Sequence, residues 1–326
     1  MQNASQPAKK NTSRIISAAV VVCGVFVAAV SGIVLFSCDK PDPKSSEQYE
    51  TATTGKAELL CDESIATFMQ PTFRLFDSSY NDAAVGIKAV SAREAMTQLF
   101  GTKARGIVIA RGYLADEDSL LKANKVPAHA STIIATDALV FAVQRNFPLD
   151  TISLAQLQRL FSEKGVSLKG MFPQLKTEPT IICPDSYSSE YGNLLLYLTK
   201  NAAPKHAITL TKNAAEAKAA VLSNPNAIAV GYLSQFARET TLKMLKIGFQ
   251  DTTGSYVRPK AVHQSYIVMG KYPLPIKIQG LLLEDRRNLP WGYITFLRND
   301  VRTKEYFLKN GIVPEGARFN LIPDEE

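Results

Sequence analysis

Apolar residues follow two alternating patterns along the chain, short runs of strand length and longer stretches with helical spacing. The short runs predict strands at 57–61, 85–90, 106–110, 131–143, 180–183, 227–233 and 266–270. Helical spacing predicts helices at 64–80, 91–100, from about 116, at 153–161, around 194–198, and at 214–222, 291–298 and 300–310. Alternation of this kind is typical of α/β architecture.

Local residues support some of these boundaries. Ser91, with Glu94 three residues later, is a capping box, and Ser153 with Gln156 repeats the pattern. Pro71 falls inside the predicted 64–80 helix, which we therefore expect to start late or to kink.

The first 38 residues have the composition of an export signal. Residues 1–14 are polar and basic, residues 15–36 carry no charge, and Leu35-Phe36-Ser37-Cys38 ends the segment. This ending resembles a bacterial lipobox, in which the cysteine, here Cys38, becomes the lipidated first residue. An uncharged run of this length is also long enough to span a bilayer as an uncleaved anchor. Either alternative places the rest of the chain outside the cytoplasm, tethered to a membrane.

Composition and charge narrow the class of protein. Residues 39–55 are rich in Ser, Thr, Pro and charged residues, which predicts a flexible tether. The chain of 326 residues is 46% hydrophobic and 21% charged, as expected of a globular protein with room for two lobes. The net charge is +7, but Lys9, Lys10 and Arg14 precede the apolar segment and no long basic run follows. We therefore expect no binding to nucleic acid.

The residues that usually carry catalysis or bind metals form no recognisable motif. His129, His206 and His263 lack metal-ligand spacing, and neither a C-x-x-C pair nor a common catalytic signature occurs. We expect no enzymatic activity, no metal and no cofactor. Cys61 and Cys183 lie in strand-like segments, which allows either a disulfide in an oxidising compartment or two buried thiols.

Short motifs between about residues 57 and 322 occur in an order that matches a known family. They are a strand at 133–140, a Pro-containing turn at 147–149, Ala229-Val230-Gly231-Tyr232, and a C-terminal stretch from Tyr272-Pro273-Leu274 to Pro314. Together they resemble the type II periplasmic binding proteins, in the phosphate-binding, PstS-like branch. In that family the first of these strands crosses between two lobes. The resemblance implies a two-lobed α/β fold, each lobe being a mixed sheet flanked by helices.

The same resemblance implies a domain organisation and a function. Lobe one would consist of residues 56–137 and 258–326, and lobe two of residues 138–257, with a ligand held in the cleft between them. The implied function is a membrane-anchored, extracytoplasmic solute-binding protein that feeds an ABC-type transporter with phosphate or another small anion. The compartment would be the cell envelope, on the periplasmic side in a Gram-negative cell. The alternative is an envelope sensor or scaffold that keeps the fold, has no uptake function and contacts another envelope complex.

A small anionic or polar ligand in such a cleft needs compact donors, usually hydroxyls, helix-start N–H groups and an arginine. Strand-to-helix turns supply the candidate ligand-binding residues, which are Ser64, Ser91, Arg111, Ser186, Ser188 and Ser189. Each has an alternative role, since the serines can act as helix caps or loop residues and the arginine can form an ion pair. Asp137, in the crossover strand, is expected to hold hinge hydrogen bonds.

The Ser-rich loop departs from the pattern of the phosphate-binding family. Those proteins carry an Arg a few residues before a Ser-Gly-Thr, whereas here the Arg is absent, Ser189 replaces the Gly and Glu190 replaces the Thr. Asp185 adds a further negative charge, and like charges a few ångström apart repel a bound anion. Binding of some ligand is therefore better supported than binding of phosphate.

The export signal gives a first testable prediction. We expect the protein extracted from membranes to begin at Cys38 and to carry acyl chains on that residue. Intact-mass spectrometry measures this directly. The mass of the uncleaved chain without acyl groups would exclude the lipoprotein and favour the uncleaved anchor.

Overall fold

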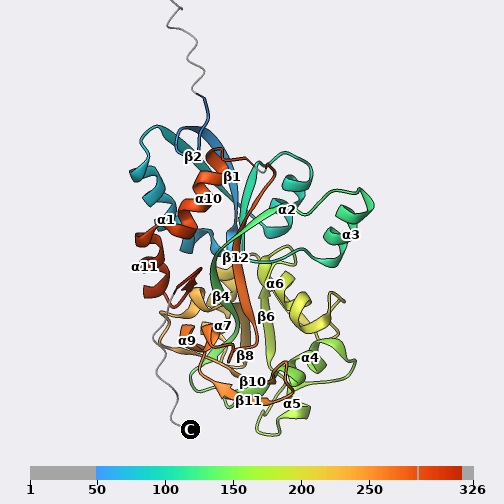
Figure 1. The fold of residues 1–326 in the computed structure, drawn as a ribbon. Coiled ribbons are helices and arrows are strands. Elements are labelled where there is room, and N and C mark those ends of the chain that lie inside the picture. The colour runs from blue at the N-terminus through green and yellow to red at the C-terminus, as the bar shows by residue number, and fades with distance from the viewer. Residues whose placement is uncertain (1–48, 285, 318–326) are drawn as a thin grey trace, which may run out of the picture. The chain divides into compact units, whose positions relative to one another are not determined.

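A long mixed sheet runs through the part of the chain that the computed structural model describes, residues 49–284 and 286–317 (Figure 1). Its strands lie in the order β2-β1-β3-β12-β4-β8-β6-β7. These strands are β1 (Gly55–Asp62), β2 (Ala83–Val90), β3 (Gly106–Ile109), β4 (Ala130–Gln144), β6 (Thr180–Pro184), β7 (Ile208–Thr211), β8 (Ala227–Tyr232) and β12 (Pro275–Leu282). A separate sheet of three strands consists of β5 (Thr151–Ser153), β10 (Lys246–Gln250) and β11 (Tyr256–Lys260).

Strand β4 is shared by two sections of the long sheet. Its first part, 130–138, pairs antiparallel with β12, and from Leu139 onward it pairs with β8 and β9 (Leu242–Met244). The short β13 (Val313–Pro314) also pairs with the first part of β4. We call β2, β1, β3, β12 and the first part of β4 the first section. The rest of β4, with β8, β6 and β7, is the second section.

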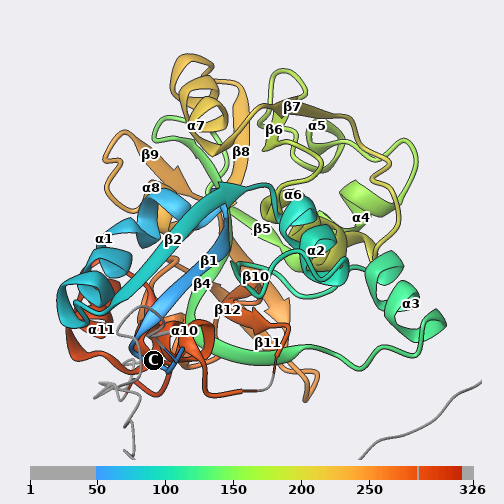
Figure 2. The same ribbon diagram turned by 90° about the horizontal axis from the view of Figure 1, so that it is seen from above.

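Helices cover both sections (Figures 1 and 2). In the first section α1 (Glu63–Ser79), α10 (Leu289–Asn299) and α11 (Val301–Lys309) pack together on one face, and α2 (Ala92–Phe100) packs on the other. In the second section α6 (Ser189–Leu194), α7 (Ala214–Ser223) and α8 (Leu233–Phe236) contact the strands. The other helices are α3 (Ala115–Ala123), α4 (Leu154–Ser162), α5 (Leu168–Met171), α9 (Gln264–Val268) and the π-helix η1 (Leu195–Thr199), which continues α6.

The central strands are apolar on both sides because helices cover both faces. In β1, Leu59 and Cys61 belong to the core formed with α1 and α10, whereas Leu60 belongs to the core formed with α2. Strand β3 alternates in the same way, with Val108 on the α1 side and Ile109 on the α2 side. Continuous apolar runs are typical of strands that are buried on both faces. This packing fixes the places where the strands end and the following helices start.

Most of the predicted boundaries are confirmed. Ser91 caps α2 and Ser153 caps α4, each side chain accepting a hydrogen bond from a backbone N–H of the first helical turn. The late start expected for the helix that contains Pro71 is wrong. Asp62 caps α1, which therefore begins at Glu63, one residue before the predicted start, and includes Pro71.

One prediction near the C-terminus is wrong, and one strand there was not predicted. The apolar run at 266–270 does not form a strand, because His263 caps a short helix, α9, at this position. A run of five apolar residues fits a buried helical turn as well as a strand, so periodicity alone does not separate them. The pattern analysis also missed β12, the strand between β3 and β4, although Ile276 and Ile278 are buried in alternation with exposed or half-buried polar residues.

The structure also bears on the cysteines and on the start of the chain. Cys61 and Cys183 are buried free thiols, so the disulfide alternative is wrong.

The export segment 1–38 with Cys38, and most of the tether, lie outside the described residues, but Glu50 is already fixed by Arg105 through two 2.7 Å contacts. Within 49–284 and 286–317, no helix combines the length and apolar character needed to cross a bilayer. These same ranges hold no cluster of His, Cys, Asp and Glu suited to a metal ion.

Candidate functional site

The ends of β1 and β3 are joined by one buried carboxylate. Asp62, the last residue of β1, is buried, and its Oδ1 accepts a hydrogen bond from the N–H of Ser64 at 3.1 Å. Its Oδ2 accepts from the N–H of Ala110, which follows β3, at 3.2 Å. Asp62 therefore caps α1 and also fixes the start of this helix relative to the neighbouring strand.

A second buried carboxyl group, that of Glu190 in the first turn of α6, lies against the start of α1. The hydroxyl of Ser64 donates to Oε2 of Glu190, and the side-chain amide of Gln235 donates to Oε1 at 2.7 Å. The same amide nitrogen of Gln235 donates to the carbonyl of Ser64 at 3.0 Å. These bonds connect α1, which packs on the first section, to α6 and α8 of the second.

The polar contacts continue behind Glu190. The side-chain amide of Asn193 donates to the carbonyl of Ala110 at 2.7 Å and to the hydroxyl of Tyr232 at 2.8 Å. The Tyr232 hydroxyl in turn donates to the same carbonyl at 3.3 Å. Asn193 and Tyr232 are both buried, and they hold the end of β3 against α6 and β8. The two sections therefore meet through a buried and largely satisfied polar network.

Burial dominates the electrostatics of this network. It raises the pKa of Glu190 to about 7, and the nearby charge of Asp62 adds to this effect. Burial also raises the pKa of Asp62, although its hydrogen bonds partly offset the increase. Removing a carboxylate from water disfavours its charged form, so both groups take up a proton more readily than in solution. The site is poorly suited to a further negative charge.

Asp137 lies in the middle of β4 and is buried. Its Oδ1 accepts hydrogen bonds from the N–H of Ala138 at 2.7 Å and from the N–H of Ser234 at 3.3 Å. These contacts lie where β4 changes its partner from β12 to β8. Burial raises the pKa of Asp137 to about 6.

Arg111, the candidate cation of the site, forms a buried ion pair with Glu117. It is 2% exposed, and its guanidinium makes two 2.7 Å contacts with the carboxylate of Glu117. It also donates to the carbonyl of Gly112 at 2.9 Å. Gly192 of α6 allows the close approach, since a Cβ there would lie 2.8 Å from Cδ of Arg111. The pair resembles a structural ion pair more than a ligand-binding group.

The serine candidates are distributed among different roles. Ser91 and Ser188 cap α2 and α6, and Ser186 is an exposed loop residue beside Asp185. Ser189 is fully buried, and its hydroxyl lies close enough to Asp62 to lower the pKa of that group, although no hydrogen bond of ordinary geometry forms. The structure thus brings Ser64 and Ser189 to the buried network and leaves the others at its edge.

The edge of the network is already closed and acidic. The N–H of Arg93, at the start of α2, donates to the carbonyl of Tyr187 in the Ser-rich loop at 3.1 Å. Nearby, partial burial raises the pKa of Glu63, and so do the negative charges of Asp62, Asp185 and Glu94. These charges oppose the entry of an anion from this side.

A pocket of about 610 Å³ opens beside the network, between α1 and α11 on one side and α7 and α8 on the other. Ser64 and Gln235 lie at the boundary that it shares with the network. Lys218 and Arg238 contribute positive charge, and Lys218 also lies 3.4 Å from the carboxylate of Glu239. Phe68 of α1 provides an apolar surface.

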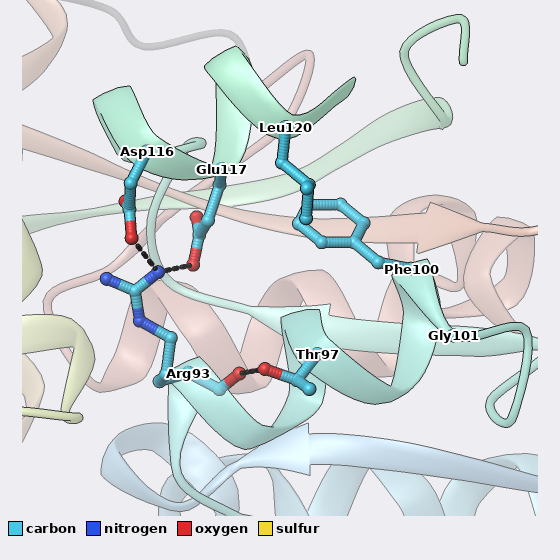
Figure 3. A pocket seen from close by; sticks show the side chains of 7 residues that line it. All are labelled: Arg93, Thr97, Phe100, Gly101, Asp116, Glu117 and Leu120. Atoms are coloured by element: carbon cyan, nitrogen blue, oxygen red, sulfur yellow. Dashed lines mark hydrogen bonds and ion pairs between the residues drawn. The ribbon is translucent and has the colours of Figure 1, made fainter. Parts of the chain in front are cut away.

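A second, smaller hollow lies between α2 and α3 (Figure 3). Phe100 and Leu120 form its apolar part. Arg93 crosses it and contacts Asp116 at 2.8 Å and Glu117 at 2.9 Å. Because this guanidinium is shared by two carboxylates, the hollow presents no free cation.

The sequence indicated Ser64 and the departure at Glu190 but not that these two residues bond to each other or that Gln235 joins them. Gln235 and Asn193 do not belong to any motif, and only the fold brings them to the network. Tyr232 was noticed as part of a strand motif and not as a hydrogen-bond donor. A tyrosine at the end of an otherwise apolar strand is the sequence feature that could have indicated this role of Tyr232.

Comparison with known proteins identifies the fold. A family model described as a PBP superfamily domain matches residues 46–296. A protein of Clostridium perfringens described as a phosphate ABC transporter substrate-binding protein, solved with phosphate, superposes with a TM-score of 0.63 at 12% identity, over 80% of this chain and 99% of that one. An ABC-type phosphate transport receptor from Vibrio cholerae gives 0.61 at 14%, over 80% and 100%. PstS from Borrelia burgdorferi gives 0.52 at 15%, over 79% and 98%.

These identities are low, so the solved structures establish a shared fold. They confirm the expected α/β fold of type II periplasmic binding proteins. No curated protein matches the sequence.

The ion pair of Arg111 gives a prediction about stability. Arg111→Ala removes the bidentate partner of the buried Glu117 carboxylate, which keeps Arg93 as its remaining cation, and should lower the free energy of unfolding by about 2 kcal/mol. Arg159→Ala removes an exposed pair with Glu163 and should cost less than about 0.5 kcal/mol. Urea denaturation of both variants measures the difference. An Arg111→Ala protein of native stability that has lost ligand binding would show instead that the arginine serves the ligand.

Proposed function

The chain belongs to the PBP superfamily, and we propose that it is a membrane-anchored, extracytoplasmic solute-binding protein that delivers a small ligand to an ABC-type transporter. Its role is binding, without catalysis. The observation that carries the proposal is the pocket of about 610 Å³, whose walls come from both sections of the sheet. A ligand that contacts both walls can stabilise one arrangement of the two sections, and a transporter can recognise that arrangement.

The pocket residues favour a small organic anion over an inorganic one. Lys218 and Arg238 place positive charge on the α7 and α8 side, whereas Glu63 places a carboxyl group at the start of α1. Phe68 and Tyr306 place aromatic surface on the α1 and α11 side. Pockets for small molecules typically combine an apolar lining with a few polar groups that fix orientation. A ligand with one carboxylate and an apolar body matches this arrangement. Phosphate would contact only the charged side of the pocket.

The proposed lobes follow the division expected from the sequence. Residues 56–137 and 258–326 would form lobe one and residues 138–257 lobe two. In support, β4 exchanges its partner β12 for β8 between Ala138 and Leu139. Asp137, with its hydrogen bonds to Ala138 and Ser234, would stabilise this crossing.

The proposed location follows from the export segment. Residues 1–38 would direct the chain out of the cytoplasm, and the lipid on Cys38, or an uncleaved helix, would hold it at the membrane. The folded part would then lie in the cell envelope next to the permease of its transporter. The tether expected over residues 39–55 would then connect the membrane anchor to the folded part.

A second function is favoured by one observation. The carboxyl group of Glu190 already connects the two sections where a buried anion would have to lie, and the N–H of Arg93 contacts the opposite loop. A binding protein closed in this way without ligand would serve as an envelope sensor or scaffold that contacts another envelope complex. In that case the outer surface, and not the pocket, would carry the function.

Calorimetry on the purified full chain in detergent separates the two functions. We expect aliphatic or aromatic monocarboxylates to bind in the pocket, while phosphate and sulfate bind more weakly or not at all. Arg238→Ala should weaken carboxylate binding about three- to tenfold, because one charge-assisted contact is lost. Arg159→Ala, which removes an exposed cation elsewhere, should leave binding unchanged.

One result would contradict the assignment of the ligand to this pocket, and another would contradict the uptake function. Tight phosphate binding that Arg238→Ala does not affect would place the ligand elsewhere in the cleft. Absence of binding for every anion tested would support the sensor or scaffold.

A further inference from the structure

Glu190 differs from the other acidic residues near the cleft because its carboxyl group is fully buried and bridges two sections of the sheet. Each of its oxygens accepts a hydrogen bond from a different helix, Ser64 of α1 and Gln235 of α8. These donors are separated from Glu190 by 126 and 45 positions in the sequence. The contacts are therefore a property of the folded cleft and not of a local turn.

The donors around this group are those that a small anion would need. Ser64 lies in the first turn of α1, a helix of 17 residues whose N-terminus favours a negative group. The amide of Gln235 is fixed in turn, since its Oε1 accepts from the N–H of Tyr232 at 2.9 Å. A hydroxyl and an oriented amide thus converge on the two oxygens of one carboxyl group.

We propose that the side-chain carboxyl group of Glu190 fills the position that a free oxyanion would need in this cleft, and that it thereby excludes such anions. The inference rests on the proposed binding function and names the residue that restricts its ligands. Small anions are excluded from the position between α1 and α6 because it is already filled. Ligands are thereby directed to the neighbouring pocket, which Ser64 and Gln235 border.

The groups that face Glu190 agree with this role. They are Asp62 at the end of β1, Tyr232 at the end of β8 and Cys183 in β6, all buried. These three groups are a carboxyl group, a phenol and a thiol, so none of them supplies a positive charge that would stabilise a bound anion. A free oxyanion bound here would place a negative charge beside two buried carboxyl groups, Glu190 and Asp62, whose own charged forms are already disfavoured by burial. Exclusion is therefore electrostatic as well as steric.

Chemical rescue tests the proposal on the full chain in detergent. Glu190→Ala removes a fragment with the size and the carboxyl group of acetate, and it should lower the melting temperature. Acetate should then raise the melting temperature of this variant saturably, by at least about 3 °C more than sodium chloride of equal ionic strength. The native chain should not respond to acetate in this way, because its position is filled.

Glu94→Ala is the matched control. Glu94 also lies in the first turn of a helix, but it is exposed, and its removal leaves no buried space. Acetate should not stabilise this variant. An equal effect of acetate on the native chain and both variants, or no effect on Glu190→Ala, would overturn the proposal.

Glu190→Gln keeps the test decisive if the alanine variant does not fold. Since burial raises the pKa of Glu190 from 4.5 to about 7, the native chain should lose stability as the pH rises through this interval. Glutamine keeps the shape without the titration. The melting temperature of Glu190→Gln should fall less than that of the native chain between pH 5 and about pH 8. Identical pH profiles would show that the carboxyl group is not held in this position.

The outcome is separable from that of the proposed function. Calorimetry with carboxylates on the native chain tests the pocket, whereas rescue by acetate tests the position of Glu190. Rescue without any ligand binding by the native chain would remove the uptake function and leave this inference intact.

Discussion

The arrangement of the cleft depends on the burial of one carboxyl group between two sections of a sheet. A buried polar group destabilises a protein unless it is hydrogen-bonded, so Glu190 requires both Ser64 and Gln235 in position. This requirement sets the distance between α1 and the helices of the second section. The packing of Asn193 and Tyr232 on the end of β3 follows from the same closure. The closed cleft is therefore a consequence of satisfying buried polar atoms.

The sheet makes this closure possible because β4 passes through both of its sections. Its change of partner from β12 to β8 brings the ends of β1, β3, β6 and β8 to one region. Helices on both faces of the first section keep β1 and β3 fixed, and so the positions of Asp62 and Ser64 are fixed with them. The neighbouring pocket has walls from both sections, which allows a ligand to respond to their relative position.

Much of the fold, but less of the site, could be predicted from the sequence. Apolar runs and capping residues were sufficient to place β1, β4, α2 and α4, because local periodicity and caps determine these elements. The same reasoning failed at α9, where an apolar run is too short to distinguish helix from strand. Ser64 was recognisable as a candidate residue and Glu190 as a departure from a motif, but neither their contact nor the part played by Gln235 was. Contacts between residues so distant in sequence arise only from the tertiary fold.

The central claim is that Ser64 and Glu190 interact directly across the cleft. A double-mutant cycle with Ser64→Ala and Glu190→Ala measures this coupling through the free energies of unfolding of four proteins. If the hydrogen bond closes the cleft, the coupling energy should be about 1 to 2 kcal/mol. Additive effects of the two substitutions, with a coupling below about 0.3 kcal/mol, would contradict the account.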